Sequence, residues 1–277
     1  MDTVQELYPV PQPAVALRGL YLAHDIRQLP RGPEGAFVYA NFVVSLDGRI
    51  AVPRGDDSGE MQVPAAIAND RDWRLFQELA VQADVLLSSG RYLRDYAAGK
   101  AQEILQVYRD PRFADLAQWR QQRGLSRQPA IAVLSHELDF PLPPALMMDG
   151  RRVLVITPRR AAVQRVAELR AAGVEVVVTD DEQALSGAAV VNALIARGLP
   201  VIYSAAGPKV LHLLLAARCL QRLYLTLAGR VLGGEPYAGV VQGPLLMPPP
   251  AMILHSACYD PHALDGGAQL LLCYACG

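Results

Sequence analysis

Polar side chains that could bind a ligand follow the first strongly apolar stretch of the chain. Residues 38–44 are apolar except for Asn41, which predicts a strand buried on both faces. The stretch ends at Ser45-Leu46-Asp47-Gly48, where Asp-Gly favours a turn and glycine tolerates a positive φ. Because ligands of open α/β sheets bind at the carboxyl ends of strands, Asn41, Ser45 and Asp47 are candidate ligand-binding residues. An ordinary turn after a buried strand would explain the same residues.

Two further strand ends carry small residues. Ser88-Ser89-Gly90-Arg91 follows a predicted buried strand over 84–87, and Ala205-Ala206-Gly207-Pro208-Lys209 follows another predicted strand over 199–204. Small residues let backbone N–H groups approach a pyrophosphate, and a helix start favours anions. Plain strand-to-helix turns are the alternative interpretation of both segments.

A third strand end carries arginine. Arg159 follows the apolar run 153–156, and its guanidinium could hold a cofactor phosphate. A simply solvated arginine is the alternative.

The elements that would position these residues alternate between strands and helices. Apolar runs at 130–134 and 174–178 predict further buried strands, and Asn69-Asp70 is a suitable cap for a helix that reaches Ala83. A helix with Val163, Val166, Ala167 and Leu169 on its inner face is expected before Gly173. This alternation indicates a mostly parallel central sheet with helices on both faces.

The remaining segments are less regular. Residues 1–36 contain several prolines and predict an extended N-terminal arm, with a short helix over 17–26. Residues 98–124 are mixed in charge and predict surface helices that are peripheral to chemistry. We therefore expect an arm at 1–36 and a single domain at 37–277.

Composition narrows the function classes. Of the 277 residues, 52% are hydrophobic and 19% charged, as in a compact globular protein, and the net charge of −1 disfavours a nucleic-acid partner. No apolar run is long enough for a membrane span, and the N-terminus does not match a secretory signal. A cytoplasmic protein with a small-molecule substrate is expected.

Cysteine spacing does not favour a metal site. Cys273-Tyr-Ala-Cys276 has the spacing of half a metal site, but no second Cys or His pair lies at a matching distance in the sequence. Incidental cysteines on a terminal strand are the preferred interpretation, so no metal is predicted. The sequence shows no catalytic triad or paired carboxylates either, and no catalytic residue is assigned.

Several segments resemble one family in order and spacing. The stretch 41–51, the stretch from Asn69-Asp70-Arg71 through 83–92, and Leu232-Gly233-Gly234 are similar to the pyrimidine reductases of riboflavin biosynthesis. In that family the reductase also occurs as a domain of a bifunctional deaminase-reductase, and it is related to dihydrofolate reductase. The resemblance implies a dihydrofolate-reductase-like fold with an antiparallel C-terminal strand pair, NADPH as cofactor, and a homodimer.

The resemblance also implies site residues. A ribosylamino-pyrimidine phosphate would be held by Asn41, Ser45, Asp47 and Asp70. NADPH would be held by three segments of the chain, namely Val44, then Ser88, Ser89, Gly90 and Arg91, and then Ala206, Gly207, Pro208, Lys209 and Val210, with Arg159 in addition. The cofactor would carry the hydride chemistry, and the protein would orient the reactants and exclude water.

One position departs from the family pattern. Where the family has Glu-Gly-Gly-Pro, the chain has Ala205-Ala206-Gly207-Pro208. The missing carboxylate puts the family's own substrate in doubt, and the alternative is an impaired reductase-like protein that binds a nucleotide or a partner without turnover. A doubly wound dehydrogenase is disfavoured because no Gly-x-Gly-x-x-Gly follows an early strand.

Overall fold

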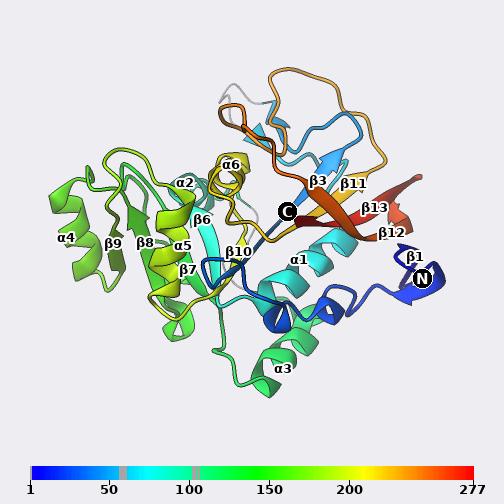
Figure 1. Cartoon of the computed structure of the whole chain (residues 1–277), viewed down its shortest axis with the longest axis horizontal. Helices are drawn as coiled ribbons and strands as arrows, with labels where there is room; N and C mark the ends of the chain where they lie inside the picture. Colours follow the sequence, from blue (N-terminus) through cyan, green and yellow to red (C-terminus); the bar gives the residue numbers. More distant parts are fainter. Residues whose placement is uncertain (1, 56–60, 102–103, 105–106) are drawn as a thin grey trace.

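One large sheet organises the chain (Figure 1). The computed structural model describes residues 2–55, 61–101, 104 and 107–277. The sheet has 11 strands in the order β2-β1-β12-β13-β11-β3-β10-β6-β7-β8-β9. These are β1 (Thr3–Tyr8), β2 (Gln12–Ala16), β3 (Phe37–Ser45), β6 (Val85–Ser89), β7 (Ala130–Leu134), β8 (Val153–Thr157), β9 (Glu175–Val178), β10 (Val201–Ser204), β11 (Arg222–Ala228), β12 (Met252–Leu264) and β13 (Gly267–Cys276). A second, two-stranded sheet pairs β4 (Val52–Pro53) with β5 (Met61–Gln62).

Helices cover both faces of the large sheet. They are α1 (Asp70–Gln82), α2 (Gly90–Ala97), α3 (Ala114–Gln122), α4 (Val163–Ala171), α5 (Gly187–Ile195) and α6 (Pro208–Ala216). Buried side chains of α1, α3 and α4 share one apolar cluster with the sheet, and those of α5 and α6 share the other. The predicted arrangement of helices on both faces is therefore confirmed.

The sheet has a parallel part and an antiparallel part. From β11 through β3, β10, β6, β7 and β8 to β9, every neighbouring pair is parallel. The pairs β11–β13 and β12–β13 are antiparallel, which confirms the expected C-terminal strand pair. Parallel strands place their carboxyl ends at one edge, so the ends of β3, β10 and β6 lie together.

Strand β3 lies in the interior of the sheet, between β11 and β10. Its residues alternate between the two apolar clusters, with Tyr39 in one and Ala40 in the other, as expected for a strand covered on both faces. It ends in the predicted turn, where Gly48 adopts a φ of +83°.

The N-terminal segment differs from the expected lead-in. Strand β1 pairs with β12, and β2 pairs with β1, so this segment extends the antiparallel end of the sheet. Two 3-10 turns, at Leu22–His24 and Ile26–Gln28, replace the short helix expected over 17–26. Pairing with a strand some 250 residues away leaves no local trace in a proline-rich segment, so the sequence pattern did not reveal it.

The expected inner face of the helix before Gly173 was wrong in part. In α4, Val166 and Leu169 are buried, but Val163 is 84% exposed and Ala167 also faces solvent, because the helix contacts the sheet along a narrow stripe. The apolar strand over 270–274 lies in β13 and is not a sheet edge, because β13 has neighbours on both sides.

Candidate active site

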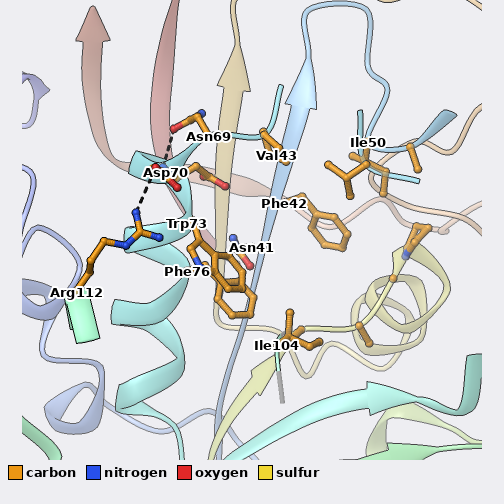
Figure 2. Close-up of a pocket in the computed structure, with 18 residues that line it drawn as sticks. Asn41, Phe42, Val43, Ile50, Asn69, Asp70, Trp73, Phe76, Ile104 and Arg112 are labelled. Carbon is orange, nitrogen blue, oxygen red and sulfur yellow. Dashed lines mark hydrogen bonds and ion pairs between the residues drawn. The ribbon is translucent and has the colours of Figure 1, made fainter. Parts of the chain in front are cut away.

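A cavity of roughly 630 Å³ lies at the carboxyl ends of β3 and β10, beside the N-terminal turns of α1. Aromatic side chains of α1 form much of one wall, and residues at the start of α6 form another part (Figure 2). Its lining combines apolar and aromatic side chains with a few polar groups, the composition typical of small-molecule sites. The lining residues are Asn41, Phe42, Val43, Ile50, Ala51, Val63, Ala68, Asn69, Asp70, Asp72, Trp73, Phe76, Ile104, Arg112, Ala205, Ala206, Gly207 and Pro208.

The first two turns of α1 and their N-cap, Asn69, line one side of this cavity. The Asn69 side chain accepts hydrogen bonds from the backbone N–H groups of Arg71 (3.1 Å) and Asp72 (2.9 Å), which fixes the first turn. The Asn69 amide also donates to Gln269 Oε1 on β13 at 2.9 Å. The helix period then brings Asp72, Trp73 and Phe76 to the cavity side.

Trp73 and Phe76 form a flat aromatic surface. Their rings are stacked, with centroids 4.6 Å apart and an interplanar angle of 15°. The ring centroids of Phe76 and Tyr203 of β10 lie 5.5 Å apart, and the Tyr203 ring stacks on that of Tyr39 of β3 with centroids 4.9 Å apart. This row of rings joins the cavity wall to the core, so the aromatic wall is rigidly held.

Asp72 is the most unusual ionisable group in the cavity. Its Oδ1 accepts a hydrogen bond from the Thr226 hydroxyl of β11 at 2.6 Å. Burial raises the pKa of Asp72 to about 6, although the Thr226 hydrogen bond acts in the opposite direction. A carboxylate that titrates near neutrality beside a cavity is a candidate functional group.

Asn41 reaches the cavity from β3. The Tyr203 hydroxyl donates to Asn41 Oδ1, which leaves the N–H donors of the amide for a ligand. The prediction that Asn41 lies at the candidate site therefore agrees with its place in the cavity lining.

The segment between β10 and α6 brings three predicted cofactor residues to the same cavity, namely Ala206, Gly207 and Pro208. Gly207 caps α6 and has open space where a Cβ would lie. The N–H groups of the first turn of a helix have no partners within the helix, and the helix dipole favours anions there. Lys209 is exposed and Val210 packs against the core, and neither lines the cavity.

Asp47 and Ser45 do not line the cavity. The Asp47 carboxylate accepts hydrogen bonds from Ser45 Oγ (2.5 Å) and from Gly233 N (2.7 Å), and it pairs with Arg49 at 2.9 Å. The hydrogen bonds from Ser45 and Gly233 hold the pKa of Asp47 well below its usual range. These contacts tie the Asp-Gly turn to the Leu-Gly-Gly segment.

The strand end at Ser88–Arg91 lies next to β10 but outside the cavity lining. Ser89 caps α2 through Tyr92 N (3.3 Å). A Cβ on Gly90 would lie 2.9 Å from Phe140, so close packing already requires this glycine. Arg91 is 58% exposed and lies 3.7 Å from Asp95.

The other two predicted cofactor residues lie elsewhere. Val44 is buried in the core. Arg159 is 61% exposed, pairs with Asp180 at 2.8 Å, and follows β8, which β7 separates from β6.

Asp70 lies at the rim of the cavity. Its side chain is 80% exposed and faces Arg112 at 3.3 Å (Figure 2). Arg112 and Ile104 come from the segment 98–124, so the expectation that this segment is peripheral was wrong.

The mixed charges of that segment are not all solvated either. Arg120 is only 2% exposed and donates to Val81 O and Ala83 O, both at 2.8 Å, at the end of α1. The sequence interpretation also missed Asp72, because an aspartate in the first turn of a capped helix is ordinary until its burial is known.

Within the described part of the chain, no group of three or more His, Cys, Asp or Glu side chains could hold a metal ion. In the same residues, every helix is too short or too polar to span a lipid bilayer.

The chain is similar to known proteins in both sequence and structure. A family model described as the RibD C-terminal domain matches residues 36–257. The chain superposes on a pyrimidine reductase-like protein from Corynebacterium diphtheriae with a TM-score of 0.68, at 20% identity over 95% of this chain and 99% of that one. No curated protein matches the sequence.

Two further solved structures share the fold. The riboflavin biosynthesis reductase Rib7 of Saccharomyces cerevisiae superposes with a TM-score of 0.54, at 11% identity over 94% of this chain and 99% of that one. RibD of Acinetobacter baumannii gives a TM-score of 0.58, at 17% identity over 88% of this chain but only 58% of RibD. The observed fold, a mostly parallel sheet with an antiparallel C-terminal strand pair, is therefore shared with these structures.

Proposed function

The chain belongs to the RibD C-terminal domain family, and from this premise we propose that it is an NADPH-dependent reductase of a pyrimidine or related heterocycle. The observation that carries the proposal is that the start of α6 and the polar, aromatic end of α1 share one cavity. A cofactor held at the helix start and a ring held against α1 would meet there.

The residues at the strand ends fit a dinucleotide. Ser88 Oγ and Ser204 Oγ, at the ends of neighbouring strands, are buried and have no hydrogen-bond partner among the described residues. Such hydroxyls are costly to leave unpaired, and they suit a ligand rich in hydrogen-bonding groups. Together with the first turn of α6, they would hold the pyrophosphate of NADPH.

The cofactor and the cavity residues have distinct proposed roles. When bound, the nicotinamide supplies a hydride to the substrate. Asn41 would donate to the substrate, Trp73 and Phe76 would hold its ring, and the apolar lining would exclude water. The substrate proposed from the family is a ribosylamino-pyrimidine of the riboflavin-precursor type.

The cofactor site is tested by a matched pair of variants at Gly207. Aspartate and asparagine both cap helices well, and the backbone there, with a φ of −75°, accepts a side chain into open space. Gly207→Asp places a negative charge where the pyrophosphate is proposed, and Gly207→Asn does not. In calorimetric titrations, Gly207→Asp should weaken NADPH roughly tenfold or more relative to Gly207→Asn.

Two results would contradict this site. One is equal affinity of the two variants for NADPH. The other is the absence of NADPH binding by the unaltered protein at high concentration.

Discrimination between NADPH and NADH is proposed to rest on Arg91 or Arg159. Each is more than half exposed and, among the described residues, has a single ion-pair partner, so it could turn towards the phosphate of the adenosine ribose. Arg91, at the start of α2, is the closer of the two to β10 along the sheet. Substitution by Ala should weaken NADPH more than NADH, and equal weakening of both would contradict the assignment.

A homodimer is also proposed. The segment between β11 and β12 carries Val231, Leu245 and Met247, which are 73%, 85% and 76% exposed, and Ile253 beside it is 62% exposed. Exposed apolar side chains in such number favour contact with another protein surface. Light scattering that reported a monomer at micromolar concentration would contradict the proposal.

A further inference from the structure

A cluster of three basic side chains, Arg222, His24 and His255, lies outside the cavity. Arg222 begins β11 and pairs with Tyr39 near the start of β3, whereas the cavity lies at the carboxyl ends of the strands. His24 ends the 3-10 turn at Leu22–His24, and His255 lies on β12. This basic cluster therefore has a place of its own in the fold.

Tyr224 of β11 connects the members of the basic cluster. Its hydroxyl lies 2.9 Å from His24 Nδ1, and the two rings are stacked with centroids 5.5 Å apart. The His24 ring meets the His255 ring edge-on, with centroids 5.9 Å apart and an interplanar angle of 90°. Because side chains alternate along a strand, Arg222 projects from the same face of β11 as Tyr224. Three separate elements thus bring their basic side chains together.

Arg222 is a half-buried cation without a counter-charge. Its Nη1 atom is buried and has no hydrogen-bond partner among the described residues. Within the same part of the chain, no carboxylate forms an ion pair with Arg222, and Asp25, which follows His24, pairs with no member of the cluster. A buried donor on a charged group is costly to leave unpaired, so this arrangement favours a ligand that supplies the acceptor.

The neighbouring charges that act on the two imidazoles are positive. Burial, and then the charges of His255 and Arg222, lower the pKa of His24 to about 4. Burial and the charge of Arg222 also lower the pKa of His255. Positive charge that is not balanced by a carboxylate attracts anions, and a bound anion would offset the repulsion within the cluster.

His24 has a donor for such an anion even when its ring is neutral. With the Tyr224 hydroxyl as the donor to Nδ1, the ring carries its proton on Nε2. That N–H points away from the Tyr224 hydroxyl, because the two ring nitrogens lie on different sides of the imidazole.

We infer that Arg222, His24 and His255 form a binding site for a small oxyanion with two negative charges, the group that inorganic phosphate and phosphate monoesters present. Donors from three elements suit a tetrahedral oxyanion, whose oxygens point in several directions, better than a halide or a single carboxylate. The guanidinium would pair with two of the oxygens, and the imidazoles would donate to the others. The inference does not depend on the proposed function, because the basic cluster lies outside the cavity.

The imidazole signals in NMR spectra test this site directly. Sulfate is the first probe, because it stays doubly charged throughout the neutral pH range. At pH 7 and constant ionic strength, sulfate should shift the signals of His24 and His255 saturably, and chloride should not. His136, which follows β7 four strands away from β11, serves as an internal control.

Two variants locate the binding. Arg222→Gln should weaken sulfate at least about tenfold, since it removes a charge-assisted pair. Arg160→Gln, which removes the same charge from an exposed position after β8, should leave the affinity unchanged. His255→Gln changes an exposed side chain and should weaken sulfate severalfold, so the site can be tested even where Arg222→Gln folds poorly.

Titrations with inorganic phosphate and glycerol 3-phosphate distinguish the two sources of the anion. Tighter binding of the ester assigns the site to a phosphate monoester, and tighter binding of phosphate assigns it to the free ion; either preference supports the inference. Equal affinity of Arg222→Gln and Arg160→Gln for sulfate would overturn it. So would the absence of a saturable shift of His24 and His255 at tens of millimolar sulfate.

Discussion

Helix α1 carries two carboxylates with opposite surroundings. Glu78, in its C-terminal half, is fully buried and accepts hydrogen bonds from Gly19 N (2.7 Å), Tyr21 N (3.0 Å) and Arg74 Nε (2.7 Å). Asp72, in the first turn, has Thr226 as the donor to its side chain and otherwise faces the cavity. The first carboxylate is saturated by the protein, and the second has room for a ligand.

The C-terminal half of α1, where the buried polar side chains are fully hydrogen-bonded, holds the N-terminal segment of the chain. One turn after Glu78, Gln82 accepts from Ile26 N and donates to Tyr21 O, both at 3.0 Å. Buried polar groups that are fully paired specify one arrangement of the chain, whereas a half-paired group is costly to the fold and persists where function needs it. Hydrogen-bond saturation, more than burial, therefore separates the structural carboxylate from the candidate site.

Substitution of Glu78, the fully hydrogen-bonded carboxylate, should have the largest effect on stability. Glu78→Gln removes one of the two carboxylates paired with Arg74, whose other partner is Asp115, and Arg74 is itself only 6% exposed. It also weakens the charge-assisted hydrogen bonds from Gly19 N and Tyr21 N. We expect a loss of about 3–5 kcal/mol in the free energy of unfolding, measured by urea denaturation. Glu168→Gln on the exposed face of α4 should stay within about 0.5 kcal/mol of the unaltered protein. A similarly small loss at Glu78 would contradict a structural role.

Neutralising Asp72, the half-paired carboxylate, should instead raise the free energy of unfolding, by an amount that depends on pH. The pKa of Asp72 is about 6 in the folded protein and about 3.9 in an unfolded chain. The folded state therefore binds the proton more tightly than the unfolded chain does. As a result, the free energy of unfolding falls as pH rises from about 4 to 6, and the full cost of ionising Asp72 in the folded protein is present above pH 6.

Asp72→Asn removes this dependence. At about 1.4 kcal/mol for each pKa unit, the variant should gain up to about 3 kcal/mol over the unaltered protein at pH 8 and almost nothing at pH 4. Urea denaturation of both proteins at the two pH values measures the difference. A constant difference across pH would mean that Asp72 is well solvated in the folded protein.

Removing the hydroxyl of Thr226 that donates to Asp72 should have the smallest effect. Thr226→Val keeps the shape of the side chain but deletes the hydroxyl that donates to Asp72 at 2.6 Å. We expect a loss of about 1 kcal/mol at pH 8 and less at pH 5, because a hydrogen bond to a carboxylate is stronger than one to a carboxylic acid. The pKa of Asp72, followed by NMR titration, should rise in the variant, and an unchanged pKa would contradict the contact.

Much of the fold was predictable because short stretches of sequence identify its elements. The apolar runs at β3, β7, β8 and β9 and the Asn69 cap of α1 each identify an element within a few residues. The pairing of β1 with β12 was not predictable in this way, since it joins distant segments and proline-rich residues give no alternation. The parallel core was therefore foreseen, and the antiparallel extension by the N-terminal segment was not.

The candidate site divides in the same way. Asn41, Asp70, Ala206, Gly207 and Pro208 line the cavity because strand ends and helix starts meet at one edge of a parallel sheet. Other site features depend on tertiary contacts that the sequence pattern does not report. Asp72 owes its raised pKa to burial and receives its hydrogen bond from Thr226, 154 residues away. Arg112 enters from a segment whose charges suggested a solvated face.

The central claim is that the cofactor and the ring meet beside α1, and energy transfer from Trp73 tests it most directly. In a Trp119→Phe variant, whose one remaining tryptophan is Trp73, NADPH is titrated while Trp73 is excited and the emission of the dihydronicotinamide is recorded. We predict quenching of Trp73 and sensitised nicotinamide emission that saturate together, at the midpoint that calorimetry gives for NADPH. Calorimetric binding of NADPH with no change in Trp73 emission would place the cofactor elsewhere and contradict the claim.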